Sequence, residues 1–337
     1  MTGDPLVSIR CLVYNHEPFL RQCLDGFVMQ KTTFPFEAIV HDDASNDGSA
    51  AIIREYAEKY PDIIKPIYET ENQWGKGTIS KSMDAVMHPN SKYIATCEGD
   101  DYWTDPFKLQ KQVDVLEEHP DVTIAFCKVN TITKEGNPLD WTIPSKESEI
   151  PVGKLTLDDY MNEEYYNFRW TFHTSTFFYR RSINKLHRQL GKTVYKRFPF
   201  GDQTIILSCL FQGKGYYIPD ITGSYRVASG GYFSNVNKSI DNRIKFYERC
   251  IKAHEDLDDY TGGRYSIAIK RRKDLSTFNI LKMKYENHLM TPWQRIKFPL
   301  YTLWKVRRSF SSFKSSFAEF LCCIAPSWFT LYEKMRH

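Results

Sequence analysis

The segment Tyr93–Trp103, YIATCEGDDYW, joins a short apolar run to a dense group of acids. Tyr93–Thr96 has the composition of a buried β-strand. Glu98, Asp100 and Asp101 follow directly, and carboxylates this close together repel one another and favour water or a cation. Open α/β sheets bind ligands outside the carboxyl ends of their strands. The segment therefore predicts a ligand-binding edge of a sheet, and a solvated acidic turn before a helix is the alternative.

The acids also indicate which ligand this edge would bind. Mg²⁺ and Mn²⁺ prefer oxygen ligands, and proteins hold them with one or two carboxylates together with the phosphate oxygens of a substrate. A divalent ion bridging a diphosphate fits the spacing of these acids. Taken alone, the cluster favours such an ion only slightly over the acidic turn.

The composition sets broad limits on the class of protein. A chain of 337 residues and 39.6 kDa has room for one large domain, or for one domain with appendages. Its hydrophobic content of 42% and charged content of 26% are ordinary for a globular protein. The formal net charge of +4 is small, so we predict no nucleic-acid partner.

The lack of a recognisable targeting signal and the positions of the cysteines predict a cytoplasmic protein. The first ten residues, MTGDPLVSIR, lack the charged and then apolar pattern of a secretory signal. No window reaches eighteen uninterrupted apolar residues, so we predict no transmembrane helix. Cys11, Cys97, Cys127 and Cys209 lie in apolar segments, and no CxxC pair occurs, which favours buried thiols in a reducing compartment over disulfides or zinc ligands.

Strand and helix patterns alternate along the first 130 residues. The predicted strands are Leu6–Tyr14, Phe36–His41, Ile63–Tyr68, Tyr93–Thr96 and Val122–Val129. The predicted helices are Phe19–Met29, Ser49–Tyr60, Thr78–Met87 and Pro106–Glu118. This alternation indicates a mostly parallel α/β sheet flanked by helices, with right-handed crossovers. The turn after the first strand, YNHEPF, contains no glycine, which argues against a dinucleotide-binding dehydrogenase.

The second half of the chain has weaker patterns. We predict a polar loop over Asn130–Pro151, a strand over Trp170–Tyr179 and a basic helix over Arg180–Leu190. A helix over about Asp202–Gln212, one or two short strands, and two charged helices between Lys238 and about Leu289 follow. We find no internal repeat and no low-complexity segment.

The order of these parts resembles the inverting glycosyltransferases of family 2, which have the nucleotide-sugar-binding α/β fold called GT-A. Three segments carry the resemblance, in the family's order: PLVSIRCLVYNHEPFLRQCLDGFVMQ, FEAIVHDDASNDGSAAII and YIATCEGDDYWTDPFKLQKQVDVL. It extends over roughly Pro5–Ser234. The resemblance implies a GT-A catalytic domain over residues 1–235, with a helical extension over 236–290 and a basic aromatic tail over 291–337.

The resemblance assigns the nucleotide to the ends of the first two strands. It implies contacts from Val13, Tyr14, Asn15 and Glu17. Glu17 has an alternative role as an exposed acid in the first turn of a helix, where the helix dipole favours it. Asp42 matches the family acid that accepts a hydrogen bond from the imide N–H of uracil. The alternative is that Asp42 or Asp43 caps the following helix.

The same resemblance identifies Glu98-Gly99-Asp100-Asp101 as the metal motif, although the family's first acid is usually Asp. It implies that Asp100 is a ligand of Mn²⁺ or Mg²⁺. Glu98 would contact the ribose, a metal-bound water or the ion itself, and Gly99 would lie beside the nucleotide. The ion would neutralise the departing nucleoside diphosphate.

The remaining site residues come from later segments. Asp202, in PFGDQTII, occupies the position of the family's general base, and an ordinary helix N-cap is the alternative. Trp103, Trp170 and His173 are predicted to line the acceptor site, although a histidine on an aromatic strand is more often a packed core residue. Arg226, in YRVASGG, is predicted to meet the diphosphate. Many relatives have a histidine near this point, where this chain has Ala228.

We therefore predict a metal-dependent inverting glycosyltransferase that moves a sugar from a nucleoside-diphosphate sugar, with UDP favoured, to a hydroxyl of a growing surface glycan such as lipopolysaccharide, capsule or exopolysaccharide. A sugar-nucleotide nucleotidyltransferase is the alternative enzyme, but it normally has a Gly-rich phosphate loop after the first strand. A non-catalytic nucleotide- or glycan-binding module is the other alternative, and the intact acids argue against it.

The C-terminal tail, residues 291–337, mixes Trp and Phe with Lys and Arg. That composition is typical of helices that lie on anionic membranes. We predict peripheral contact with the inner face of the cell membrane, where a lipid-linked glycan acceptor would also lie. The alternative is a helix that packs its aromatic side onto the catalytic domain.

Overall fold

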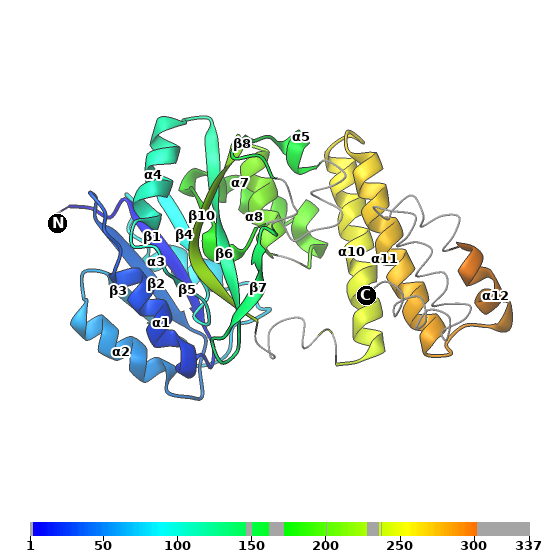
Figure 1. Cartoon of the computed structure of the whole chain (residues 1–337), viewed down its shortest axis with the longest axis horizontal. Coiled ribbons are helices and arrows are strands. Elements are labelled where there is room, and N and C mark those ends of the chain that lie inside the picture. Colours follow the sequence, from blue (N-terminus) through cyan, green and yellow to red (C-terminus); the bar gives the residue numbers. More distant parts are fainter. Residues whose placement is uncertain are drawn as a thin grey trace. The chain divides into compact units, whose positions relative to one another are not determined.

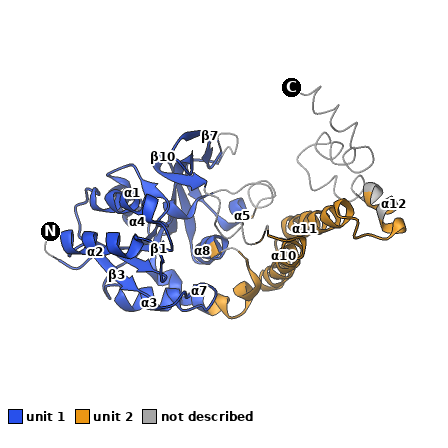
Figure 2. Cartoon of the chain, turned by 90° about the horizontal axis from the view of Figure 1, so that it is seen from below, with its two compact units in different colours: residues 1–160, 169–188, 202–229 blue, residues 161–168, 189–201, 230–337 orange. Residues whose placement is uncertain are grey.

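The computed structural model describes residues 3–145, 150–161, 172–199, 201–227, 236 and 238–301. The chain divides into two compact units (Figure 2). Unit 1 comprises residues 1–160, 169–188 and 202–229, and unit 2 comprises residues 161–168, 189–201 and 230–337. Unit 1 contains the sheet and every described residue of the predicted site.

The first half of the sheet is parallel, as the sequence predicts. β1 (Val7–Val13) pairs in parallel with both β2 (Phe36–Asp42) and β4 (Tyr93–Thr96). β3 (Ile64–Tyr68) pairs in parallel with the other edge of β2. β1 and β2 are almost entirely buried and consist mainly of apolar and β-branched residues, which suits parallel strands that are covered on both faces. The strands run side by side in Figure 1.

The second half makes the sheet mixed. β9 (Phe178–Arg180) is antiparallel to both β4 and β6 (Val122–Thr133), between which it lies. β10 (Lys214–Val227) is parallel to β6. The short strands β5 (Tyr102–Trp103), β7 (Pro138–Ile143) and β8 (Gly153–Leu155) pair antiparallel with β10, β6 and β10 respectively. Over the described residues the strand order is β3-β2-β1-β4-β9-β6-β10-β5.

Three predictions for the second half were wrong in detail. The segment predicted as a polar loop, Asn130–Pro151, instead contains the end of β6 and all of β7, because Val129 and Ile132 are buried against the returning strand. The predicted short strands after Gln212 form one long strand, β10. Within the described part of Trp170–Tyr179, a 3₁₀ turn over Thr174–Thr176 precedes β9, because the side chain of His173 accepts a hydrogen bond from Ser175 N.

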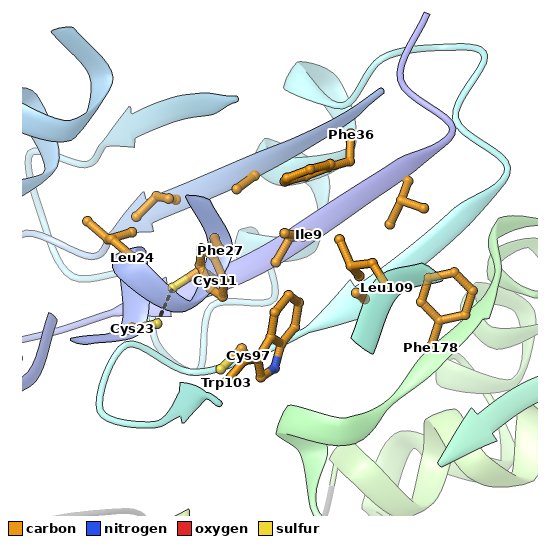
Figure 3. Close-up of a cluster of buried hydrophobic side chains, with 14 of the residues drawn as sticks. Ile9, Cys11, Cys23, Leu24, Phe27, Phe36, Cys97, Trp103, Leu109 and Phe178 are labelled. Carbon is orange, nitrogen blue, oxygen red and sulfur yellow. Dashed lines mark hydrogen bonds between the residues drawn. The ribbon is translucent and has the colours of Figure 1, made fainter. Parts of the chain in front are cut away.

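Helices cover both faces of the sheet. α1 (Glu17–Val28), α2 (Ser49–Lys59) and α4 (Lys108–Glu118) pack on one face, where their apolar side chains join those of β1, β2 and β4 in a buried cluster. Figure 3 shows Ile9, Phe27, Trp103 and Leu109 within this cluster. α3 (Ile79–Val86) and α7 (Asn184–Gly191) lie on the opposite face (Figure 2). Arg10 reaches α3 there, donating from Nη2 to Ser80 O at 2.9 Å.

Unit 1 also contains α5 (Leu157–Tyr160), the 3₁₀ helix Arg181–Ile183 and nearly all of α8 (Gly201–Leu210). The 3₁₀ helix Val194–Arg197 belongs to unit 2. The predicted helix over Asp202–Gln212 is thus confirmed as α8.

Unit 2 is helical. α10 (Ile240–Tyr260) and α11 (Ser266–Glu286) confirm the two predicted helices, and α12 (Pro292–Tyr301) follows. Ser239 caps α10 by accepting a hydrogen bond from Asn242 N at 3.1 Å. Phe298 of α12 packs on Phe278 and Tyr285 of α11. None of the helices in the described ranges has both the length and the apolar character that crossing a membrane requires.

A close contact between α1 and β5 fixes the position of Trp103. A methyl group on Gly26 would lie 3.0 Å from both the backbone N and the backbone O of Trp103. The indole is 2% exposed, donates from Nε1 to Ser175 O at 2.8 Å, and meets the Phe27 ring edge-on at 4.9 Å between centroids. The absence of a side chain at position 26 therefore allows α1 to approach the segment that follows the acid cluster.

We expect Gly26→Ala to lower the free energy of unfolding by about 1–3 kcal/mol, because the added methyl collides with backbone atoms that cannot rotate away. Urea unfolding followed by circular dichroism measures this change. Gly191→Ala in α7 is the matched control, since its methyl would meet no atom within 4 Å. Equal unfolding curves for the two variants would contradict the close packing of α1 on β5.

Candidate active site

The carboxyl ends of three parallel strands form one edge of the sheet. Val13 at the end of β1 is opposite Asp42 at the end of β2, and Arg10 is opposite Thr96 at the end of β4. The segments that follow these strands therefore emerge together. This edge is where an open α/β sheet binds its ligand.

Hydrogen bonds in both directions join the segments that follow β1 and β2. Asn15 N donates to Ser45 Oγ, and Asn46 N donates back to Asn15 Oδ1. Glu17 N donates to Asp47 Oδ2, and Gly48 N donates to Glu17 Oε2 at 2.8 Å. These contacts hold the ends of β1 and β2 together. The side chains of Asn15 and Glu17 thus have a structural function, whereas the predicted nucleotide contact of Glu17 stays a prediction.

The two acids at the end of β2 have different surroundings. Asp43 Oδ1 accepts from Gln73 N at 2.6 Å, so this carboxylate holds the loop after β3 instead of capping α2. Asp43 N also donates to Val13 O. Tyr14, the next residue after Val13, is 44% exposed. Asp42 is 3% exposed, and its Oδ1 has no hydrogen-bond partner among the described residues. A buried acceptor without a donor suits a ligand that supplies an N–H group.

The loop after β4 carries Glu98, Asp100 and Asp101 and is called the acid loop from here on. Its backbone pairs with β1. Cys97 N donates to Arg10 O, and Gly99 N donates to Leu12 O at 2.9 Å, so the parallel pairing continues beyond β4. A methyl group on Gly99 would lie 2.8 Å from His16 Nδ1 and 3.0 Å from Val13 Cγ2. Glycine is therefore required at position 99 for the loop to approach β1.

The side chains of the acid loop experience strong electrostatic repulsion. Burial, together with the charges of Asp100 and Asp202, raises the pKa of Glu98 to about 7, although Thr174 Oγ1 donates to its Oε2 at 2.8 Å. Burial and the charges of Asp100 and Glu98 also raise the pKa of Asp101 well above its ordinary value. The Asp100 side chain is 30% exposed. A cation at this edge would relieve the repulsion.

Asp202 belongs to the same group of charges. It lies in the first turn of α8, and its Oδ1 accepts from Gln203 N at 2.8 Å. Its charge contributes to the raised pKa of Glu98, so the fold brings the two carboxylates, 104 positions apart in the sequence, close enough to interact. The charge of the predicted base therefore reaches the predicted metal motif.

Arg226 is buried and bonds to the backbone of the acid loop. The residue is 3% exposed, and its Nε donates to Asp100 O at 3.0 Å. Its Nη1 donates to Lys134 O at 2.9 Å, and its Nη2 donates to Gln22 Oε1 at 2.8 Å. The guanidinium is therefore buried and bonded within the protein, and the diphosphate contact stays a prediction that would require these bonds to break.

The two described residues predicted to line the acceptor site, Trp103 and His173, are buried. Trp103 is a core residue, as described above. His173 is 3% exposed and packs against Tyr225, with 4.1 Å between the ring centroids and a tilt of 34° between the rings, and its Nδ1 lies 3.7 Å from Asp101 Oδ2. Burial lowers the pKa of its imidazole to about 3. Neither side chain is exposed to contact an acceptor. Trp170 lies outside the described residues.

The sequence did not predict two residues that lie beside the acids, His16 and Thr174. His16 Nε2 lies 3.9 Å from Asp100 Oδ2, and its Nδ1 is buried with no partner among the residues described. Thr174 donates to Glu98. The place of His16 directly after the first strand was a usable signal, because that position lies at the ligand edge. Nothing in the local sequence around Thr174 indicates its contact with residue 98.

Comparison with solved structures supports the fold. Staphylococcus aureus TarS (residues 1–349), determined in complex with UDP-GlcNAc, superposes with a TM-score of 0.55 at 16% identity, over 94% of this chain and 81% of that one. The mannosyltransferase PcManGT from Pyrobaculum calidifontis, in complex with GDP-Man and Mn²⁺, has a TM-score of 0.50 at 15% identity, over 97% and 89%. The predicted GT-A fold is confirmed, with a mixed sheet.

Sequence relatives identify the family. The putative glycosyltransferase EpsE of Bacillus subtilis is 35% identical over 262 residues, which are 77% of this chain and 87% of that protein. An uncharacterized protein of Mycobacterium tuberculosis is 43% identical over 145 residues, and this match spans only 39% of its length. The family model of glycosyl transferase family 2 matches residues 8–187, more than half of the chain. The chain therefore belongs to glycosyl transferase family 2.

Proposed function

We propose that the chain transfers a sugar from a UDP-sugar to a hydroxyl group of a surface glycan, with inversion at the anomeric carbon and with a divalent metal ion bound at the acid loop. The observation that supports this proposal is that the charges of Asp100 and Asp202 both act on Glu98, which follows the carboxyl end of β4. Glu98 and Asp100 would hold the metal ion that binds the donor diphosphate, and Asp202, from a distant segment, would face the acceptor.

The preference for uracil rests on Asp42. Its buried Oδ1 has no donor within the described part of the chain, and uracil has an imide N–H that needs an acceptor. Hydrogen bonds to charged groups are among the stronger ones in proteins. TarS, which has the same fold, was determined with UDP-GlcNAc, whereas PcManGT was determined with GDP-Man. A GDP- or dTDP-sugar is therefore the competing donor.

The acid loop suits a divalent ion that is bound partly by the protein and partly by phosphate oxygens of the substrate. Among the described residues, no three His, Cys, Asp or Glu side chains are grouped as a complete metal cage. Mg²⁺ and Mn²⁺ in phosphate sites use one or two carboxylates together with phosphate oxygens. Asp100, with its partly exposed carboxylate, and Glu98 would supply these protein ligands. When bound, the ion would act as a Lewis acid that neutralises the departing diphosphate.

Asp202 would act as the general base. As the acceptor hydroxyl attacks the anomeric carbon, the bond from this carbon to the diphosphate oxygen breaks and UDP leaves. The hydroxyl proton passes to the carboxylate of Asp202. The position of Asp202 in the first turn of α8 suits a helix cap equally well, so its catalytic role needs a variant that separates the two functions.

The acceptor and the membrane contact are further parts of the proposal. α12 exposes Trp293, which is 72% exposed and has Lys297 Nζ 5.9 Å from its ring centroid. An exposed aromatic beside a cation is typical of a helix at an anionic membrane surface. The remainder of the aromatic tail lies outside the described residues. A lipid-linked glycan would bring the acceptor to that surface.

We expect the purified chain to release UDP slowly from one member of a panel of UDP-sugars in the presence of Mn²⁺. EDTA or Asp100→Ala should reduce this release by roughly a hundredfold or more, because the diphosphate loses its neutralising charge. Coupled detection of UDP measures the rate. Turnover that survives both treatments would contradict the metal-dependent mechanism, and turnover confined to GDP- or dTDP-sugars would contradict the choice of nucleotide.

We expect Asp202→Asn to lower the transfer rate about 10²–10⁴-fold, because the amide cannot accept the hydroxyl proton. The affinity for UDP, measured by calorimetry, should stay the same. Asn caps helices about as well as Asp does, so a structural role for Asp202 would leave both quantities unchanged. A fully active Asp202→Asn enzyme would therefore remove Asp202 from the mechanism.

We expect Asp42→Ala to weaken UDP binding roughly 10- to 100-fold, because uracil loses a charged hydrogen-bond acceptor. Adenine has no imide N–H, so the affinity for ADP should change little. Calorimetry with both nucleotides on the wild type and the variant measures the difference. An equal loss for UDP and ADP would indicate a general disturbance of the loop instead of a contact with the base.

A further inference from the structure

We propose that Arg226 is a positioning residue that holds Asp100 and Asp101 in the geometry needed to bind the metal and the donor diphosphate. The inference rests on the proposed function, because it assigns a supporting residue to that same site. It differs from the diphosphate contact predicted from the sequence, since Arg226 would act through the acid loop without touching the substrate.

Arg226 bonds two residues of the acid loop. Its backbone N donates to Asp101 Oδ1 at 2.9 Å, a bond that does not depend on the side chain at position 226, and its Nε donates to the backbone O of Asp100 at 3.0 Å. The first bond orients the Asp101 side chain, and the second fixes the peptide that carries the Asp100 side chain. One residue at the end of β10 therefore sets both the backbone and the buried acid of a loop that is 125 positions earlier in the sequence.

The rest of the guanidinium ties the loop to two other segments. Nη2 donates to Gln22 Oε1 in α1, and Nη1 donates to Lys134 O in the turn between β6 and β7. The guanidinium carbon lies 4.4 Å from the ring centroid of Phe19 and 5.9 Å from that of Tyr102. Four segments of unit 1, namely α1, the acid loop, the β6–β7 turn and β10, thus meet at one side chain.

This geometry favours a supporting role over direct binding. With 3% of the residue exposed, a diphosphate could reach the guanidinium only if these bonds broke. The buried guanidinium also places a positive charge beside the acid loop, with its Nε 3.0 Å from Asp100 O. Ligands of a metal are commonly oriented by such partners behind them.

Arginine is required for this set of bonds. Its planar group presents donors in several fixed directions, so it can bond three acceptors on different segments while it stacks on an aromatic ring. Lysine would keep the charge, but it has a single nitrogen and cannot reproduce the same fork. Arg226→Lys therefore separates the positive charge from the directional bonds.

The experiment compares Arg226→Gln and Arg226→Lys with Arg180→Gln. Arg180 is a matched control because it also bonds a backbone carbonyl, with Nε donating to Val122 O at 2.7 Å, and lies over the ring of Tyr93. Arg180 is opposite Tyr93, at the end of β4 that lies away from the acid loop. We expect all three variants to lower the melting temperature, so stability alone does not distinguish them.

Calorimetric titration with UDP, with and without Mn²⁺, gives the decisive measurement. We expect both Arg226 variants to weaken Mn²⁺-dependent UDP binding about 10- to 100-fold, with Arg226→Lys less affected, and Arg180→Gln to bind as the wild type does. Wild-type affinity in the folded Arg226→Lys variant, or an equal loss in Arg180→Gln, would overturn the positioning role. A wild-type chain that binds no nucleoside diphosphate with any divalent ion would instead overturn the proposed function, and this inference with it.

Discussion

The parallel pairing of β1 with both β2 and β4 is the constraint on which the rest of the structure depends. Parallel neighbours end at the same edge of a sheet, so the segments after Val13, Asp42 and Thr96 are brought together regardless of their distance in the sequence. Hydrogen bonds between the loops then refine the arrangement. Gly99 N bonds to Leu12 O, and Gly48 N bonds to Glu17 Oε2. The chemical groups of the site are therefore positioned by backbone pairing before any side chain contributes.

This arrangement has an electrostatic cost. Glu98 and Asp101 are withdrawn from water beside other acids, and burial first, then the charges of neighbouring carboxylates, raise the pKa values of both. The protein offsets part of this cost with donors placed around the acids, such as Thr174 and Arg226. Functional sites commonly retain such unfavourable charge, because a bound cation or substrate can then be stabilised by it.

Local patterns predicted much of unit 1. The strands and helices of the first 130 residues match the structure to within a few residues, because apolar periodicity reports burial directly. The pattern failed where pairing partners are distant. The polar residues of Asn130–Pro151 conceal the alternation of a hairpin, so the sequence predicts a loop there. The sequence also predicts an acceptor contact for Trp103. In the folded protein, contact with Gly26 and Ser175 places that indole in the core.

The sequence by itself determined the α/β class and the acids Glu98 and Asp100 as candidates for chemistry, because residue type and position after a strand are local properties. It also determined the family resemblance, and through it the candidates Asp42 and Asp202. Only the tertiary structure decided which of the candidates meet and which are buried. It brought Asp202 to Glu98, left Asp42 Oδ1 without a described partner, and turned the guanidinium of Arg226 inward toward Asp100 and Gln22. The physical reason is that burial and hydrogen-bond partnership depend on contacts between residues far apart in the chain, which no local pattern records.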